Sequence, residues 1–263
     1  MIFIVTALKC EAVPFIQKYS LKMIPSAGSF SIYGADDIKL VITGTGGPAA
    51  LCAVTYLLAS SDAAKEDVVI NCGCSGLAAG DPGCKEKTFV IRSVRDEAFG
   101  RSFYPDMITD LSLPEADLIT VTKIRTQPPT DPAREVPLLV DMEGAYVYQA
   151  ASRFIYAHNI YMIKTVSDIG SDSILLRPED IGRLMDTVAS SPGRQIIDQE
   201  RTVPKSHTLS FYQTSELKKL AENYALRRND LDELMEGFNN TVFTSRREAK
   251  AAYAKLRAKL LMP

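Results

Sequence analysis

The sequence has 263 residues, of which 46% are hydrophobic and 24% are charged, the balance of an ordinary globular protein. This length fits one large α/β domain, or one domain with an appendage. The formal net charge of −2 argues against a general nucleic-acid-binding protein.

The chain begins with an apolar run, but Lys9 ends it, so the run is too short for a signal peptide or a membrane span. The five cysteines are an odd number, and although Cys72 and Cys74 resemble half of a metal site, buried or loop thiols fit better. Free thiols indicate a reducing, cytoplasmic location. The only histidines, His158 and His207, lie outside every motif described below, so we expect no metal site and no other cofactor.

The first 190 residues alternate between patterns typical of strands and of helices. Short apolar runs rich in β-branched residues predict strands at 1–7, 38–44, 66–76, 87–99, 117–126, 136–143 and 160–172. Helical spacing predicts helices at 49–60 and 145–159, and a proline followed by acids predicts a helix over 177–191. This order indicates an α/β protein, a three-layer α/β/α sandwich with a mixed, mainly parallel sheet.

The pattern changes towards the end of the chain. The stretch "SPGRQ" (191–195) breaks the preceding helix, and amphipathic helices are predicted at 214–228, 230–238 and 245–261. Residues 201–263 carry 12 basic against 7 acidic side chains. We therefore expect a main domain over 1–200 and a helical C-terminal extension over 201–263. The basic face is read as the solvated side of a packed helix rather than as a site for a partner or nucleic acid.

Polar residues gather where the predicted strands end, and ligands bind at the carboxyl ends of strands in such sheets. These residues are Glu11, 43–47, 71–76, Asp141, Glu143, Ser167 and Asp168. Asp141 and Glu143 follow an apolar run and are separated only by Met142, so strand alternation places them on the same side of the chain. A buried ionised carboxylate costs several kcal/mol unless it is paired. At least one of the two is therefore expected to face a ligand.

Five segments, each at a predicted strand end, resemble a known family in the same order. They are "TALKCEAVPF", "TGTGGPAA", "INCGCSG", "VDMEGAYVYQAA" and "IKTVSDIGSD". They resemble the nucleoside phosphorylase and nucleosidase superfamily, and are most similar to its methylthioadenosine/S-adenosylhomocysteine nucleosidases. The resemblance covers about residues 1–190. It implies the purine nucleoside phosphorylase-type fold and cleavage of the N-glycosidic bond of a purine-type nucleoside.

That reaction passes through an oxocarbenium-like ribosyl cation, so it needs a nucleophile, a proton for the departing base and a hold on the sugar. The resemblance implies that Glu11 activates water, that Asp168 protonates N7 of the purine, and that Glu143 binds the ribose 2′- and 3′-hydroxyls. From the residues alone, each acid also has a structural interpretation: a first-turn acid, a turn former and a helix N-cap, respectively. Asp141 is interpreted as structural.

The resemblance also implies further substrate-binding residues. Lys164 stands where the nucleosidases usually carry arginine, and Phe103 is a candidate for stacking on the base, although core or surface packing would explain it equally well. The remaining ones are Met142, Gly46, Cys74, Ser75, Gly76 and Ser167.

Water and phosphate are the alternative nucleophiles. A phosphorylase needs cationic side chains at its phosphate pocket, yet Asn71 occupies one of the matching positions and Lys9 is the only cation in the first loop. Hydrolysis is therefore favoured. A phosphate-dependent phosphorylase (a glycosyltransferase) and a non-catalytic nucleoside-binding module remain as alternatives. The resemblance further implies a homo-oligomer that acts on a small nucleoside. Since no segment of the sequence approaches a membrane span, we expect no membrane partner.

Overall fold

The computed structural model describes residues 1–25, 29–106, 110–124, 127–170 and 177–202, and beyond them residues 217, 232, 235–238, 240, 252–256 and 258. The chain divides into two compact units, Met1–Glu200 and Arg201–Pro263. Within the second unit, the described residues from 217 onward are helical apart from Asn240 in a turn. Most of the three helices expected there lies outside the described residues. No described helix has the length and hydropathy needed to cross a bilayer.

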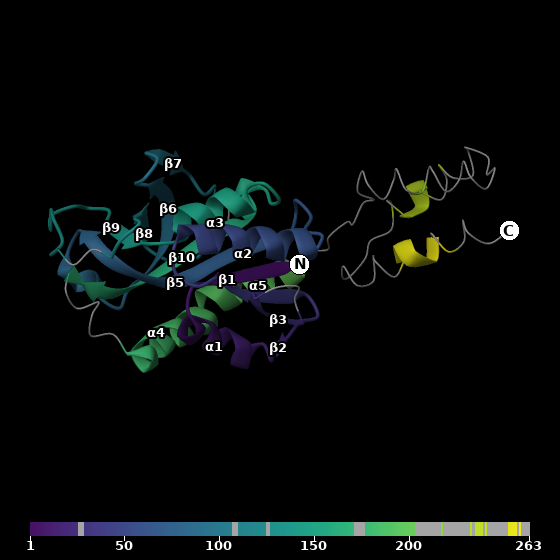
Figure 1. The fold of residues 1–263 in the computed structure, drawn as a ribbon, viewed down its shortest axis with the longest axis horizontal. Helices are drawn as coiled ribbons and strands as arrows, with labels where there is room; N and C mark the ends of the chain where they lie inside the picture. The colour runs from purple at the N-terminus through teal and green to yellow at the C-terminus, as the bar shows by residue number, and fades with distance from the viewer. Residues whose placement is uncertain are drawn as a thin grey trace. The chain divides into compact units, whose positions relative to one another are not determined.

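The first unit contains a ten-stranded sheet and five α-helices among its described residues (Figure 1). The strands are β1 Ile2–Thr6, β2 Lys22–Met23, β3 Ser31–Ala35, β4 Ile38–Ile42, β5 Val68–Ala79, β6 Thr88–Asp96, β7 Arg101–Phe103, β8 Glu115–Thr120, β9 Leu138–Asp141 and β10 Ile160–Ile169. The α-helices are α1 Lys9–Lys18, α2 Gly47–Ser60, α3 Gly144–Ala151, α4 Pro178–Ser190 and α5 Pro192–Thr202, and short 3-10 turns lie at Pro82–Cys84 and Ala157–Asn159.

The sheet is mixed, as expected. Among the described residues its pairings divide equally, five parallel and five antiparallel, with β1 lying between β4 and β5 in parallel register. Strand β10 pairs with both β5 and β6, so β5, β9, β8, β6 and β10 close into a ring at one end of the sheet. Because β1 is parallel to β4 and β5, and β5 is parallel to β10, these four strands run towards the same edge of the sheet.

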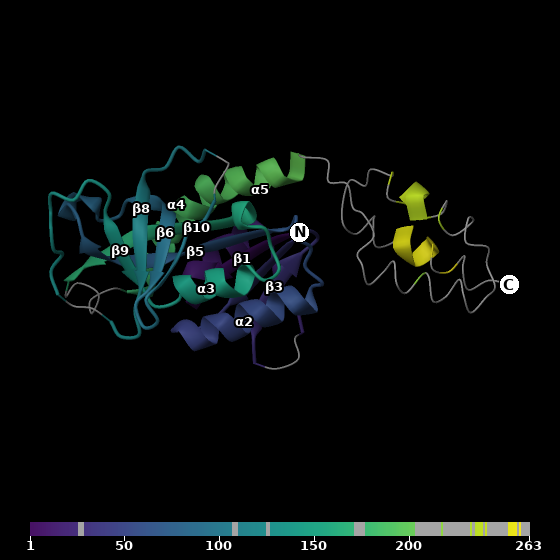
Figure 2. The same cartoon turned by 90° about the horizontal axis from the view of Figure 1, so that it is seen from above.

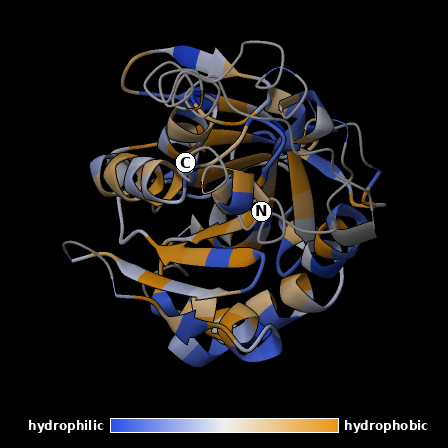
Figure 3. Ribbon diagram, turned by 90° about the vertical axis from the view of Figure 1, so that its right-hand side faces the viewer, coloured by the Kyte–Doolittle hydropathy of each residue, from blue (hydrophilic) through white to orange (hydrophobic). Residues whose placement is uncertain are grey.

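Helices cover both faces of the sheet, which confirms the expected three layers. Helices α2 and α3 pack together on one face, and α1, α4 and α5 lie on the other (Figures 1 and 2). Strand β1 shows why: its alternate residues enter the two cores, Phe3 and Val5 towards α2 and α3, Ile2 and Ile4 towards α1 and α4. A strand buried on both faces reads as a continuous apolar run, and Figure 3 shows the central strands as largely hydrophobic.

Several elements differ from the sequence-based expectation, among them the short strands β2, β3 and β7, which it does not include. The helix predicted over 145–159 ends at Ala151, and a 3-10 turn over Ala157–Asn159 leads into β10. The break expected at 191–195 is present at Ser191, but a further helix, α5, starts directly afterwards with Pro192 in its first turn, where proline is tolerated. Helix α1 is not predicted as an element, because Pro14 lies inside it and its buried apolar face is short.

Candidate active site

The carboxyl ends of β1 and β4, the middle of β5 and β10, the first turn of α1 and the start of α3 surround one pocket. Its empty volume is about 230 Å³, part of which is open to solvent. Side chains that lie far apart in the sequence share this lining: Val5, Thr6, Ala7, Glu11, Thr43, Asn71, Cys72, Gly73, Cys74, Glu143, Val147 and Lys164. Of the residues predicted to form a site, Glu11, Glu143, Cys74 and Lys164 are thereby brought together.

Glu11 lies in the first turn of α1 and is only 3% exposed. Its Oε2 accepts hydrogen bonds from the backbone N–H groups of Ala7 (2.8 Å) and Leu8 (2.9 Å), and its Oε1 accepts one from Cys74 N–H (2.8 Å). Burial raises the pKa of Glu11, and these three hydrogen bonds, with the charge of Lys164, offset only part of that increase. The structure thus holds in place a carboxylate whose affinity for a proton is higher than usual.

Glu143 occupies the N-cap position of α3, and its Oε1 accepts a hydrogen bond of 2.6 Å from the Gly46 N–H. The chain at Gly46 has a φ of +94°, which favours glycine, and at Gly47 an added Cβ would lie 2.3 Å from the ring of Tyr146. The glycine pair therefore lets the loop before α2 approach Glu143. Burial raises the pKa of Glu143, and the neighbouring charge of Asp141 raises it further.

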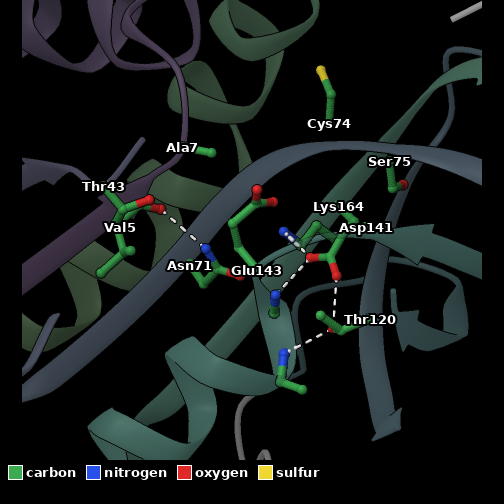
Figure 4. A network of polar contacts seen from close by, with 12 residues as sticks. Val5, Ala7, Thr43, Asn71, Cys74, Ser75, Thr120, Asp141, Glu143 and Lys164 are labelled. Carbon is green, nitrogen blue, oxygen red and sulfur yellow. Dashed lines mark hydrogen bonds and ion pairs between the residues drawn. The ribbon is translucent and has the colours of Figure 1, made fainter. Parts of the chain in front are cut away.

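Asp141 and Lys164 form a buried ion pair beside these acids. The Lys164 Nζ lies 2.9 Å from Asp141 Oδ2, and the side chains are 3% (Lys164) and 2% (Asp141) exposed (Figure 4). The same Oδ2 accepts a bond from Gly144 N–H, and Oδ1 accepts one from the Thr120 hydroxyl. Burial alone would lower the pKa of Lys164, but Asp141, Glu143 and Glu11 together raise it, so the side chain is an ammonium ion.

Asp168 lies at the end of β10, where the pairing with β5 shifts register between Val166 and Asp168. Such an irregularity re-aims the side chains that follow it. The Ser167 hydroxyl lies 2.6 Å from Asp168 Oδ1 and 3.3 Å from the Ser75 carbonyl oxygen. An added Cβ on Gly76 would lie 2.9 Å from Asp168 Oδ2. Ser75, Gly76, Ser167 and Asp168 therefore form one cluster next to Cys74, although the described lining of the pocket does not include Asp168.

Two predicted residues lie elsewhere or have no described contact with the site. The Phe103 ring, on β7, packs at 5.4 Å against the ring of Tyr148 and adjoins the apolar core, which matches the packing interpretation of this residue. Met142 is half-buried between the two acids. Neither belongs to the described pocket lining.

Some site residues are not singled out by the sequence pattern. Thr120 links two elements, since it donates to Asp141 and accepts from Ala145 N–H at the start of α3. Thr6 Oγ1 is buried in the pocket wall and has no hydrogen-bond partner within the described structure; the same holds for Oδ1 of Asn71, a residue that the sequence does place at the site. Thr6 is the last residue of β1. Threonine is common in strands, so the sequence alone does not mark Thr6 as a site residue.

The thiols of the pocket are protonated. Burial raises the pKa of Cys72 to about 12, and it raises that of Cys74 still further. The thiolate is the nucleophilic form of cysteine, so neither residue is suited to attack a substrate. In the part of the chain that the structure describes, no group of three or more metal-binding side chains comes together.

Solved structures with the same fold include several nucleosidases. The methylthioadenosine/S-adenosylhomocysteine nucleosidase of Helicobacter pylori matches at 13% identity over 75% of this chain and 97% of its own, with a TM-score of 0.58. A futalosine hydrolase mutant of H. pylori matches at 14% identity (75% and 98%, TM-score 0.60), and the 5′-methylthioadenosine nucleosidase of Arabidopsis thaliana at 17% (77% and 96%, TM-score 0.60). No protein-family model and no curated protein matches the sequence. At these identities the likeness establishes the architecture alone: the chain has the fold that these nucleosidases share.

Proposed function

We propose that this protein is a nucleosidase, an N-glycosyl hydrolase that cleaves the bond between ribose and the base of a purine-type nucleoside with water. The observation that carries the proposal is the position of Glu11. It is a buried carboxylate of raised pKa, held by three backbone N–H groups, in the same pocket as a second such carboxylate, Glu143. An acid with a raised pKa is matched to accept a proton from water near neutral pH.

In this proposal Glu11 is the general base. Its hydrogen bonds fix the carboxylate, so it can take a proton from a water molecule that attacks the anomeric carbon. General acid–base assistance of this kind is worth roughly 10² to 10⁴ in rate. The two raised-pKa acids also place negative charge beside the ribosyl cation as it develops, which stabilises the transition state more than the neutral substrate.

Glu143 and Asp168 have the other two roles. Oε1 of Glu143 accepts a hydrogen bond from Gly46 N–H, and Oε2 accepts hydrogen bonds from the ribose hydroxyls. Asp168 protonates the departing base from the neighbouring cluster, in which Ser167 holds its carboxyl and Ser75 and Gly76 supply the adjoining wall. Cys74, Lys164, Gly46 and Met142 line or adjoin the sugar site in this proposal, whereas the core packing of Phe103 weakens its proposed role in stacking on the base.

Water is favoured over phosphate by the charge of the pocket. Lys164 is the only cation in the described lining, and Asp141 already neutralises it. Asn71 donates its amide N–H to the Val5 carbonyl, which leaves its oxygen, an acceptor, as the atom without a partner. A dianionic phosphate needs cationic partners, and the described lining offers it one cation that is already paired, beside the carboxylates of Glu11 and Glu143.

The named relatives fit the same chemistry. The three solved structures described above are named for hydrolases of nucleosides, two of them for methylthioadenosine. We propose a purine-type nucleoside for this chain on that basis, together with the acids at the matching positions. We also propose that the protein works in the cytoplasm as a homo-oligomer and that residues 201–263 form a separate helical part; the five free cysteines favour a reducing compartment.

A screen of the purified full-length chain tests this proposal. The protein is incubated with adenosine, inosine, guanosine, 5′-methylthioadenosine and uridine, and free base is measured by chromatography. Release of a purine base, abolished in Glu11→Gln and retained in a control variant at the exposed Glu86, is the expected result. Glu86 is a suitable control because it lies on the surface, where it pairs with Arg183. No release from any purine nucleoside would refute the proposal.

A further inference from the structure

Asp141, which the proposed reaction does not use directly, has three polar contacts among the described residues, as many as Glu11. Its Oδ2 accepts from Lys164 Nζ and from Gly144 N–H, both at 2.9 Å, and its Oδ1 accepts from the Thr120 hydroxyl at 2.7 Å. The position next to Asp141 is sterically fixed as well, because a Cβ on Gly144 would lie 2.8 Å from Asp141 Oδ2. Every one of these contacts is buried, so the carboxylate has a single orientation.

The Lys164 ammonium group, which pairs with Asp141, also lies near the Glu11 carboxylate. A Cβ added at Gly73 would lie 3.0 Å from Glu11 Oε1 and 3.5 Å from Lys164 Nζ, so the ends of both side chains lie next to Gly73 of β5. Even so, among the described residues the ion pair of Lys164 is with Asp141, and Glu11 is held by backbone N–H groups alone. A flexible ammonium group that near a second carboxylate would pair with it if its present partner were absent.

We propose that Asp141 is a positioning residue for catalysis: it holds the Lys164 ammonium away from Glu11, which leaves Glu11 without an ion-pair partner, and it anchors the start of α3 that carries Glu143. The inference rests on the proposed function for its catalytic meaning, but its structural content does not depend on it. Thr120 extends the anchor, since its oxygen accepts from Ala145 N–H while its hydroxyl donates to Asp141.

The position of the Lys164 ammonium group affects the pKa of Glu11. Burial raises the pKa of Glu11 most, and Lys164 is the cation that lowers it. The titratable groups that interact with Glu11 come from four elements: Cys10 on α1, Cys72 and Cys74 on β5, Glu143 at the start of α3 and Lys164 on β10. Lys164 is the only one of these that carries positive charge, so its position sets how strongly the ionised form of Glu11 is favoured.

The test follows the Glu11 carboxyl directly, by carbon NMR of protein labelled at glutamate side chains. The Glu11 resonance is assigned by its loss in Glu11→Gln. In Asp141→Asn we expect the titration midpoint of Glu11 to fall by about 1 unit or more, because an ammonium group that pairs with a carboxylate lowers its pKa by about that amount. In the double variant Asp141→Asn/Lys164→Gln, which has no cation, the midpoint should lie at or above that of the unaltered protein.

Two controls separate this role from loss of charge or of packing. Asp117→Asn removes another partly buried carboxylate, one that binds Arg92, Arg134 and Ser93, and should leave the Glu11 midpoint unchanged. Thr120→Val breaks the link to α3 without changing any charge, and should raise KM through Glu143 while the Glu11 midpoint stays in place.

The outcomes are distinct. A Glu11 midpoint that is the same in Asp141→Asn and in the unaltered protein would overturn the positioning role, and so would a fall that persists in the double variant. If the midpoints move as expected but the unaltered protein releases no base, the nucleosidase proposal fails and the positioning of Lys164 stands. If the protein is an active hydrolase and Asp141→Asn keeps both its acidic-limb pH profile and its kcat, the positioning role alone is refuted.

Discussion

Replacing Glu11 by glutamine should stop turnover while the fold survives. The carboxylate accepts three backbone N–H bonds, two at Oε2 and one at Oε1. A glutamine can keep its oxygen on Ala7 and Leu8, which leaves its NH₂ group facing the N–H of Cys74. One buried donor then lacks an acceptor, at a cost of about 1–3 kcal/mol. Because burial already disfavours the charged form of Glu11, removal of the charge offsets part of this cost.

The loss of activity should be much larger than the loss of stability. Without a base to accept the proton from water, kcat should fall by about 10² to 10⁴ at saturating nucleoside. KM should change little, because Glu143 and the rest of the sugar site are intact. The assay measures free base by chromatography, with urea unfolding as a check on the fold and Glu86→Gln as the matched surface control. A Glu11→Gln enzyme that keeps kcat within about tenfold of the unaltered protein, on the scale of general-base effects, would refute the assignment of Glu11 as base.

Four further predictions concern other residues and pH. Asp168→Asn should lower kcat by about 10² to 10⁴, most for the nucleoside with the poorest leaving group, and a uniform loss across a substrate series would argue against proton donation to the base. Glu143→Gln should weaken binding and turnover together, which steady-state kinetics and calorimetric titration would separate from a pure kcat effect. Gly144→Ala should destabilise the fold by about 1–3 kcal/mol in urea unfolding, since its methyl group would meet two side chains at 2.6 and 2.8 Å, whereas Gly182→Ala on α4, with its nearest atom at 3.8 Å, should stabilise it slightly. The raised pKa values of Glu11 and Glu143 contribute stability that is present below the ordinary glutamate pKa and is lost as pH rises through the raised values. The free energy of unfolding, measured with urea, should therefore fall as pH rises through that window. Its dependence on pH should be weaker in Glu11→Gln.

Much of the architecture is predictable from local pattern. A strand such as β1, buried on both faces, leaves a continuous apolar run, and a proline followed by acids marks the start of α4. The closed ring at one end of the sheet is not predictable in this way, because it depends on β10 pairing with both β5 and β6, and pairing between distant strands has no signature in either segment alone.

The site is predictable only in part, for a related reason. The expectation that polar residues follow strand ends places Glu11, Asn71 and Glu143 at one rim, and all three line the pocket, although β5 continues past Asn71 to Ala79. The sequence indicates a structural role for Asp141, but its contact with Lys164 depends on the side-by-side placement of β9 and β10 with β5, which the sequence does not state.

Phe103 illustrates the same limit for an aromatic side chain. Its sequence context fits both stacking on a base and packing in the core. In the structure the hairpin of β6 and β7 carries the ring to Tyr148, which accounts for its packing, while its contact with a base stays a prediction.

The identity of the sugar product shows whether water or phosphate attacks the nucleoside. The purified protein is given the purine nucleoside that it cleaves fastest, with and without inorganic phosphate, and both the free base and the sugar are quantified. If water is the nucleophile, we expect one ribose, or its 5′-substituted form, for each base released, at a rate that phosphate does not increase. Formation of ribose 1-phosphate, with a rate that saturates as phosphate is raised, would contradict hydrolysis and identify phosphate as the nucleophile.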